Sequence, residues 1–191
     1  MLLEPFSQAP LGNLKNRVVM SAMTRGFCGT NHTATDEMAD YYGRRAEDGV
    51  ALILTEGTVI HPHGDGYNNV PHIETGEQVE TWKKVASRVQ ASGTKIVSQL
   101  WHCGRISHED YTGGVAPLSS VIIPAAGTNR QNNKPFGTPR AMRDDDFQIV
   151  YAQYAHAAKN AVIAGFDAVQ MHLGHGYLAD QFFDARINTR T

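Results

Sequence analysis

The feature that most constrains the fold is a repeated order of strand, polar loop, helix and glycine along the chain. Three predicted helices stop at Gly49, Gly93 and Gly165, and each glycine leads within two residues into an apolar segment that predicts a strand. This order is typical of parallel β/α units, in which helices cover a parallel sheet. The sequence therefore predicts an α/β fold.

Four strands and three helices are predicted in detail. Val50 to Thr55 is a continuous apolar run, which is typical of a strand covered on both faces. Thr75 begins the second helix, and Gln78 follows three residues later, the spacing of a capping box. The predicted strands span residues 17–23, 50–55, 95–101 and 166–172, and the predicted helices run from 35 to 48, from 75 to the glycine at 93, and from 144 to 164.

Two long segments interrupt this order. Residues 103–142 are rich in Gly, Pro, Ser, Thr and Asn and show no sustained period, and residues 57–75 form a second strand-to-helix loop. A loop this long inside a compact domain is usually functional, although a disordered insert is the alternative. We expect residues 103–142 to form a lid or binding excursion after the third strand.

Charge and hydropathy exclude several classes of function. The 191 residues carry 17 basic and 19 acidic side chains, a formal net charge of −2, so nucleic acid and anionic membranes are not expected as partners. The longest apolar run, residues 50–54, is far shorter than the roughly 20 residues of a membrane span. Residues 1–14 lack the apolar core of a signal peptide. We therefore expect a cytoplasmic protein.

Candidate chemistry lies where the strands end, because residues that follow parallel strands converge on one mouth. His172 ends the fourth strand, and His175 and Tyr177 follow it. Two imidazoles can donate hydrogen bonds to one oxygen, and a phenol can supply a proton. Structural histidines with satisfied hydrogen bonds are the alternative. The other strand ends carry Thr24, Arg25, Glu56, Gly57, Gln99, Trp101 and His102.

Metal binding is a competing interpretation, because nine histidines include three close pairs. These pairs are His61 and His63, His102 and His108, and His172 and His175. Zinc sites need three or four ligands with a supporting second shell, and no standard spacing with cysteine or a carboxylate is present. We predict no metal site, and a metal-dependent barrel hydrolase is the alternative that this prediction disfavours.

Several segments together resemble the old yellow enzyme family, flavin-dependent ene reductases that fold as TIM barrels. The segments are LKNRVVMSAMTR, TEGT, SQLWHCGRISH, PRAM, AGFDAVQMHLGHGYLADQFF and INTRT, and they extend over essentially the whole chain. The resemblance implies a (β/α)8 barrel of which about the first four β/α units are present. Residues 1–191 would then be the N-terminal half of an FMN-binding domain, since a complete barrel has about 250 residues.

The resemblance also implies roles for nine residues. The contacts to FMN would be made by Met23, Thr24, Gly57, Gln99 and His172. The contacts to substrate would be made by Tyr67, Trp101, His172 and His175. Tyr177 would donate the proton, and the two histidines would hold the carbonyl or nitro oxygen of the substrate.

The implied reaction is the ping-pong reduction of an activated alkene, such as an enone or a nitro compound. NAD(P)H reduces FMN, and flavin N5 then transfers hydride to the β-carbon while Tyr177 protonates the α-carbon. Polarising the substrate oxygen would stabilise the enolate-like charge of the transition state. The flavin carries the hydride chemistry, and the protein positions it.

Two departures from the family pattern affect this expectation. Ala22 stands where the family usually has proline, and Thr191 lies within a motif that continues in relatives. Barrel phosphate sites are typically built by the loops after strands seven and eight, so we expect the FMN phosphate anchor to be missing. Unpaired sheet edges favour a complementary C-terminal half or self-association. A non-catalytic half barrel that acts through such association is the alternative function.

Overall fold

The computed structural model describes residues 1–8 and 11–190, and its centre is a four-stranded parallel sheet. The strand order is β10–β5–β4–β3, so each strand lies beside the next one of the β/α series. The strands are β3 (Val19–Met20), β4 (Leu52–Val59), β5 (Lys95–Trp101) and β10 (Ala168–Met171). This is the arrangement of four consecutive barrel strands, and it confirms the predicted parallel α/β fold.

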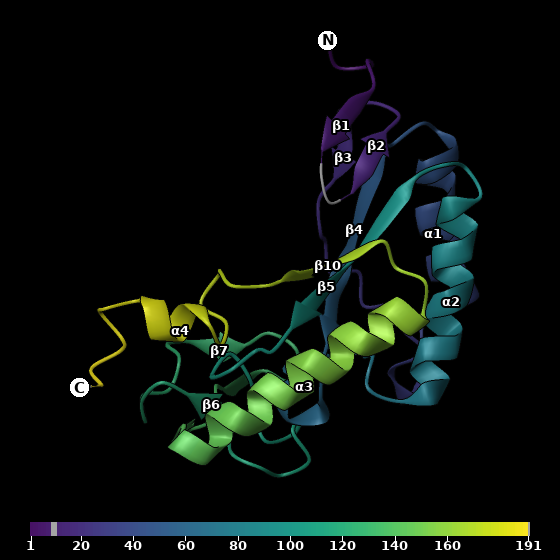
Figure 1. Cartoon of the computed structure of the whole chain (residues 1–191). Helices are drawn as coiled ribbons and strands as arrows, with labels where there is room; N and C mark the ends of the chain where they lie inside the picture. Colours follow the sequence, from purple (N-terminus) through teal and green to yellow (C-terminus); the bar gives the residue numbers. More distant parts are fainter. Residues whose placement is uncertain (9–10, 191) are drawn as a thin grey trace.

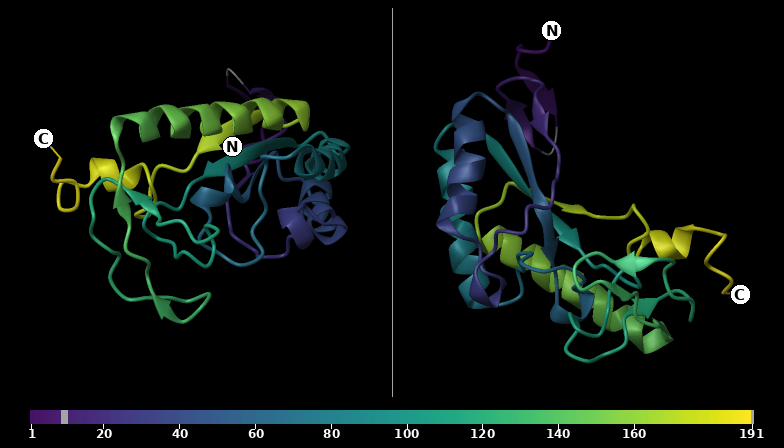
Figure 2. Two further views of the ribbon diagram at one scale, coloured as in Figure 1. Left: turned by 90° about the horizontal axis from the view of Figure 1, so that it is seen from below. Right: turned by 180° about the vertical axis from the view of Figure 1, so that it is seen from behind.

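Three long helices lie on one side of the sheet (Figures 1 and 2). They are α1 (Asp36–Glu47), α2 (Gly76–Gln90) and α3 (Asp144–Ile163). The main core forms between them and the strands, where Ile53 and Ile96 pack with the fully buried Trp82. The predicted capping box is present at the start of α2. No helix in the described part of the chain is long and apolar enough to cross a membrane.

The other face of the sheet would line the interior of a closed barrel. At its amino end, Leu52 and Val97 pack against Leu14 of a short hairpin. The hairpin joins β1 (Phe6–Gln8) and β2 (Gly12–Leu14), and it lies at the end of the sheet far from the C-terminus (Figure 1). Sequence patterns had not predicted this hairpin. It closes one end of the interior face and leaves the carboxyl end of the strands for ligands.

The predicted limits of three strands were wrong, and the strand expected over residues 166–172 is only β10. The first strand, expected over residues 17–23, is only β3, because this edge strand pairs with β4 through two residue pairs. The second strand continues to Val59 instead of ending at Thr55, across a register shift after Leu54. The polar residues after Leu54 resembled a loop in the sequence, but their side chains form hydrogen bonds inside the protein. Thr55 Oγ1, for example, accepts a hydrogen bond from Gln99 N at 3.1 Å.

The excursion of residues 103–142 is folded against the carboxyl end of the sheet. It contains four two-residue strands, namely β6 (Leu118–Ser119), β7 (Thr128–Asn129), β8 (Lys134–Pro135) and β9 (Arg140–Ala141). β6 pairs with β9, and β7 pairs with β8. Cys103 N donates to Gly64 O at 2.8 Å, and Ser107 Oγ donates to Asp65 O. The excursion is thereby tied to the loop that follows β4.

An ion pair anchors the start of α3. Asp146 is buried and accepts hydrogen bonds from Arg140 Nη1 and Nη2 at 2.6 and 2.8 Å, and from Arg143 N at 2.6 Å. The Arg140 guanidinium holds the pKa of the Asp146 carboxyl well below its usual value of 3.8. We predict that Asp146→Asn lowers the free energy of unfolding by about 1–2 kcal/mol at pH 7.

This stabilisation depends on pH in a defined direction. The folded state favours the carboxylate, so the contribution is present above the usual aspartate pKa and is lost as the pH falls through the lower folded pKa. Urea unfolding of the wild type and of Asp146→Asn, at pH 7 and at about pH 2, measures this contribution to the free energy of unfolding. Asp145→Asn is the matched control, because Asp145 is exposed in the same helical turn. An equal loss in both variants would contradict the role of the ion pair.

Candidate active site

Seven of the nine predicted site residues line one cavity of about 210 Å³ at the carboxyl end of the sheet. These residues are Thr24, Gly57, Gln99, Trp101, His172, His175 and Tyr177, and Ala22 lines the same cavity. Tyr67 reaches the site through Tyr177, because the two phenol oxygens are 2.7 Å apart. Met23 is 44% exposed and is not among the lining residues. The structure therefore brings together side chains from four neighbouring β/α units.

The two histidines are presented by the end of β10 and the turn after it. His172 N donates to Leu100 O at 2.9 Å, which continues the pairing of β10 with β5. His175 has a left-handed backbone (φ 61°) between Gly174 and Gly176, and such outliers cluster at functional sites. His175 Nδ1 lies 3.5 Å from His172 Nε2. Burial, and then the neighbouring His175, lower the pKa of His172, so its imidazole is neutral at pH 7.

Tyr177 is packed among aromatic rings. Its ring meets Trp101 and His172 edge to face, each with ring centroids 4.9 Å apart. Burial, and then the hydrogen bond to Tyr67, raise the pKa of the Tyr177 phenol well above its usual value. The phenol therefore keeps its proton at neutral pH, and it can give that proton only to a strong base, such as a carbanion formed during a reaction.

Gln181 holds the turn that carries His175 and Tyr177. This fully buried side chain lies in α4 (Asp180–Phe183), and its Nε2 donates to Gly176 O at 2.7 Å and to Cys103 O at 3.3 Å. Its Oε1 accepts from Arg105 N at 3.2 Å. Gln181 thus joins the turn to the beginning of the excursion. Nothing in its local sequence pattern predicted this role.

Gly57 is required by the packing of Trp101. A Cβ atom at position 57 would lie 2.4 Å from Trp101 Cε3, closer than real Cβ contacts allow. The Trp101 ring is buried and stacks on His172, with centroids 6.2 Å apart and planes inclined by 24°. Because glycine has no side chain, position 57 leaves room for the Trp101 ring, which in turn packs against His172.

Glu56 supports the segment that carries Thr24. It is buried, and its Oε2 accepts hydrogen bonds from Arg25 N at 3.2 Å and from Gly26 N at 3.4 Å. Burial raises the pKa of its carboxyl, while the two backbone donors act in the opposite direction. Glu56 was predicted to lie past the end of its strand among groups for hydrogen bonding and proton transfer. It instead lies inside β4 and holds a loop.

The donor set of the cavity fits the ring of a flavin. Gln99 Nε2 donates to Gln170 Oε1 at 2.7 Å, which fixes the amide and leaves its carbonyl oxygen and second N–H for a bound group. Together with the Thr24 hydroxyl, this set matches the alternating carbonyl and N–H groups of a flavin pyrimidine ring. Among the residues that the structure describes, neither lysine nor arginine lines this cavity, and the absence of an FMN phosphate anchor is still a prediction.

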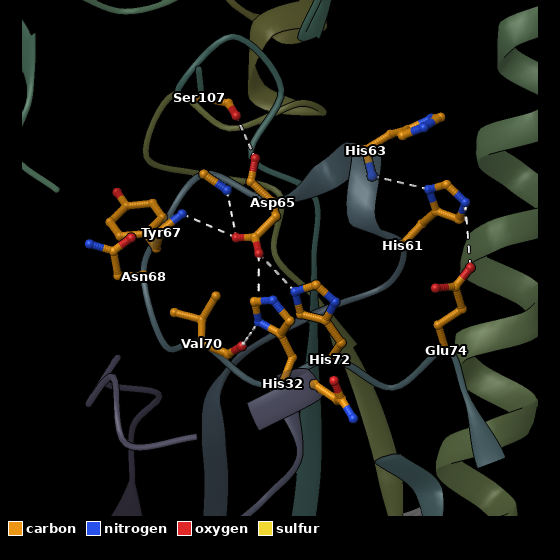
Figure 3. A network of polar contacts seen from close by, with 12 residues as sticks. His32, His61, His63, Asp65, Tyr67, Asn68, Val70, His72, Glu74 and Ser107 are labelled. Carbon is orange, nitrogen blue, oxygen red and sulfur yellow. Dashed lines mark hydrogen bonds and ion pairs between the residues drawn. The ribbon is translucent and has the colours of Figure 1, made fainter. Parts of the chain in front are cut away.

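A second polar cluster joins the loop after β4, which carries Asp65 and His72, to His32 in the segment after β3 (Figure 3). Asp65 Oδ2 accepts from His72 Nε2 at 2.8 Å, and its Oδ1 accepts from the backbone N–H groups of residues 66 and 67. His32 stacks on His72, with ring centroids 3.8 Å apart, and its Nδ1 lies 2.8 Å from Val70 O. These three side chains are spaced closely enough for a metal ion. However, a ring nitrogen this close to a carbonyl carries a hydrogen and has no lone pair to offer.

This cluster therefore orders the loop through hydrogen bonds. Sequence spacing had paired the histidines differently and did not predict it, because His32 and His72 meet only in the folded chain. The absence of a metal site is still a prediction.

The fold and the cavity define the class of the protein: a partial α/β barrel that presents histidine, glutamine and tyrosine side chains at the carboxyl ends of its strands. The chain belongs to the NADH:flavin oxidoreductase / NADH oxidase family, whose sequence profile matches residues 1–191. This family, which includes the old yellow enzymes, uses FMN with NAD(P)H.

Individual relatives agree with this assignment. The chain is 39% identical over its whole length to 12-oxophytodienoate reductase 7 of Oryza sativa subsp. japonica, covering 49% of that protein. It is 35% identical to putative 12-oxophytodienoate reductase-like protein 2A of Arabidopsis thaliana, covering 69% of it.

Among solved structures, an old yellow enzyme homologue from Zymomonas mobilis matches 99% of the chain with a TM-score of 0.93 and 35% identity. Morphinone reductase matches the whole chain with a TM-score of 0.91, also at 35% identity. The chain covers 53% and 52% of these two structures. It thus spans about half the length of most of these relatives, as the predicted half barrel requires.

Proposed function

We propose that this chain supplies the substrate-polarising and proton-donating half of an FMN-dependent ene reductase. The observation that carries the proposal is the convergence of His172, His175 and Tyr177 on one cavity, beside Thr24 and Gln99. The substrate is an activated alkene, either an enone or a nitro compound. Relatives named as 12-oxophytodienoate reductases and as morphinone reductase support reduction as the reaction class.

Most of these residues contact either the flavin or the substrate. Thr24, Gln99, His172 and the backbone of Met23 and Gly57 contact the flavin ring. FMN, reduced by NAD(P)H, supplies the hydride for the β-carbon. Trp101 and Tyr67 shape the substrate pocket.

The substrate oxygen is polarised by the two imidazoles. His172 and His175 each donate an N–H to it, and such donors lower the barrier because they point where negative charge develops. Tyr177 then releases its proton to the α-carbon. The raised pKa of Tyr177 suits this step, because the phenol stays protonated until the carbanion-like centre forms.

Exposed apolar side chains near β10 support the proposal that a second half of the barrel packs there. Val169 and Met171 of the edge strand are 39% and 48% exposed, and Ile163 at the end of α3 is 50% exposed. In a closed barrel, the next β/α unit covers these positions. We propose that a complementary C-terminal half covers this surface and supplies the FMN phosphate anchor, while the excursion of residues 103–142 serves as a lid.

Flavin absorption and alkene reduction test the proposal. The chain is mixed with FMN alone, and with FMN plus a polypeptide that covers the remaining half of 12-oxophytodienoate reductase 7. We expect a protein-bound flavin spectrum and NADPH-dependent reduction of 2-cyclohexenone in the second mixture. Complex formation, detected by light scattering, without flavin binding or reduction would favour the alternative of a non-catalytic half barrel. Self-association of the chain alone is read from the same measurement.

A further inference from the structure

A pair of tyrosines lies between the small cavity and a much larger one, and Thr24 lines both cavities. The larger cavity has a volume of about 1000 Å³, and its lining includes Tyr67, Asn68, Asn129 and Arg130. Tyr177 lines the small cavity and Tyr67 lines the large one, and neither ring lines both. The two phenol oxygens, 2.7 Å apart, therefore form a hydrogen-bonded bridge between the two spaces.

Tyr67 is held firmly in this bridging position. Its backbone N donates to Asp65 Oδ1 at 3.1 Å, and Asp65 is itself fixed by His72 (Figure 3). The Tyr67 ring packs against Trp101, with ring centroids 4.9 Å apart. The Asp65 cluster thus sets the position of a hydroxyl group next to the proton donor. A residue that only filled the substrate pocket would not need its hydroxyl group at this position.

Tyr177 has a single side-chain hydrogen-bond partner within residues 1–8 and 11–190, and that partner is Tyr67. Once Tyr177 has released its proton, the resulting phenolate is surrounded by aromatic rings and needs a proton from a neighbouring group. The polar lining and the volume of the large cavity suit it to hold water.

We propose that Tyr67 is a positioning residue that returns a proton to Tyr177 from solvent in the large cavity. The proposal rests on the proposed ene reductase function. As the Tyr177 O–H bond breaks and a C–H bond forms at the α-carbon, the Tyr67 O–H bond breaks and the Tyr177 O–H bond re-forms. A water molecule or buffer acid in the large cavity then protonates Tyr67. The step moves one net proton from solvent to product and needs no electrons beyond those of the hydride that reduced FMN supplies.

A transient negative charge is less unfavourable on Tyr67 than on Tyr177, although burial raises the pKa of both phenols. Burial, and to a smaller extent Cys103, raise the pKa of the Tyr67 phenol, but the hydrogen bond with Tyr177 and the positive charge of Arg130 act in the opposite direction. Tyr177 has no such compensation, because its hydrogen bond to Tyr67 and the charges near it all raise its pKa. The phenolate charge is therefore more stable on Tyr67, which lines the large cavity, than on Tyr177.

The test compares Tyr67→Phe with Tyr151→Phe, which removes an exposed hydroxyl on α3, in the reconstituted FMN complex. We expect Tyr67→Phe to slow steady-state alkene reduction at least 10-fold, to raise its solvent deuterium isotope effect to about 2 or more, and to regain rate as imidazole buffer is added. Flavin reduction by NADPH should change less than twofold. Tyr151→Phe should match the wild type in every measurement.

Two results would overturn the proposal. One is alkene reduction by Tyr67→Phe without a change in isotope effect and without rescue by imidazole. The other is equal slowing of both half-reactions, which indicates structural damage. A wild-type complex that binds no flavin would instead overturn the proposed function. The pairing of the phenols is then still testable on the chain alone, where ring-carbon NMR should show the Tyr177 signal shifting in Tyr67→Phe and not in Tyr151→Phe.

Discussion

Replacing Tyr177 with phenylalanine is expected to slow alkene reduction by about 10²- to 10⁴-fold while leaving the reduction of bound flavin by NAD(P)H nearly unchanged. This range is the usual contribution of a positioned general acid. The substitution keeps the ring that packs edge-on against Trp101 and His172, so the walls of the cavity persist. Only the hydroxyl, with its raised pKa, is lost.

Stopped-flow measurement of the two half-reactions separates these effects. Flavin bleaching by NADPH reports the first half-reaction, and re-oxidation by an enone reports the second. Re-oxidation by a quinone is the control acceptor, because its reduction needs no proton at carbon. Equal slowing with NADPH, enone and quinone would contradict the assignment of Tyr177 as proton donor.

Removing the imidazole of His175 is expected to lower kcat for alkene reduction by about 10²- to 10³-fold, the usual cost of one lost oxyanion donor. His175→Gly is the appropriate variant, because the left-handed backbone (φ 61°) strains alanine but not glycine. His175→Asn is the matched control. Asparagine tolerates this backbone region and offers an amide N–H, so it should retain most of the rate.

Steady-state kinetics and calorimetry together decide this prediction. The loss in His175→Gly should appear in kcat more than in the dissociation constant of a ground-state enone, because the donor acts on charge that develops in the transition state. A loss of similar size in the asparagine variant would show that position 175 contributes something other than a hydrogen-bond donor.

Local sequence patterns predicted much of this structure. The strand over residues 95–101 and the capping box at Thr75 are confirmed, since both depend on neighbours along the chain. The convergence of His172 and Gln99 on one mouth follows from parallel strands, whose carboxyl ends share one edge of the sheet. The functional roles of these residues came from the family resemblance and are still predictions.

The supporting contacts could not be predicted because they join distant segments. Glu56 looked like a strand end, since a polar side chain after an apolar run usually marks a loop. Its burial depends on backbone donors from the loop after β3. The contacts of Gln181 with Cys103 and Gly176 likewise cross the excursion, whose course shows no periodicity. Periodic patterns report local conformation, whereas these hydrogen bonds require the tertiary fold.

The close approach of Gly57 and Trp101 restricts the order in which this pocket can change. Any side chain at position 57 meets the Trp101 ring, so a larger residue there is accommodated only after the tryptophan has been replaced by a smaller one. The reverse order passes through an overpacked intermediate. A mutational route toward bulkier or differently shaped alkenes must therefore begin at Trp101. Libraries that vary position 57 alone should yield few folded variants.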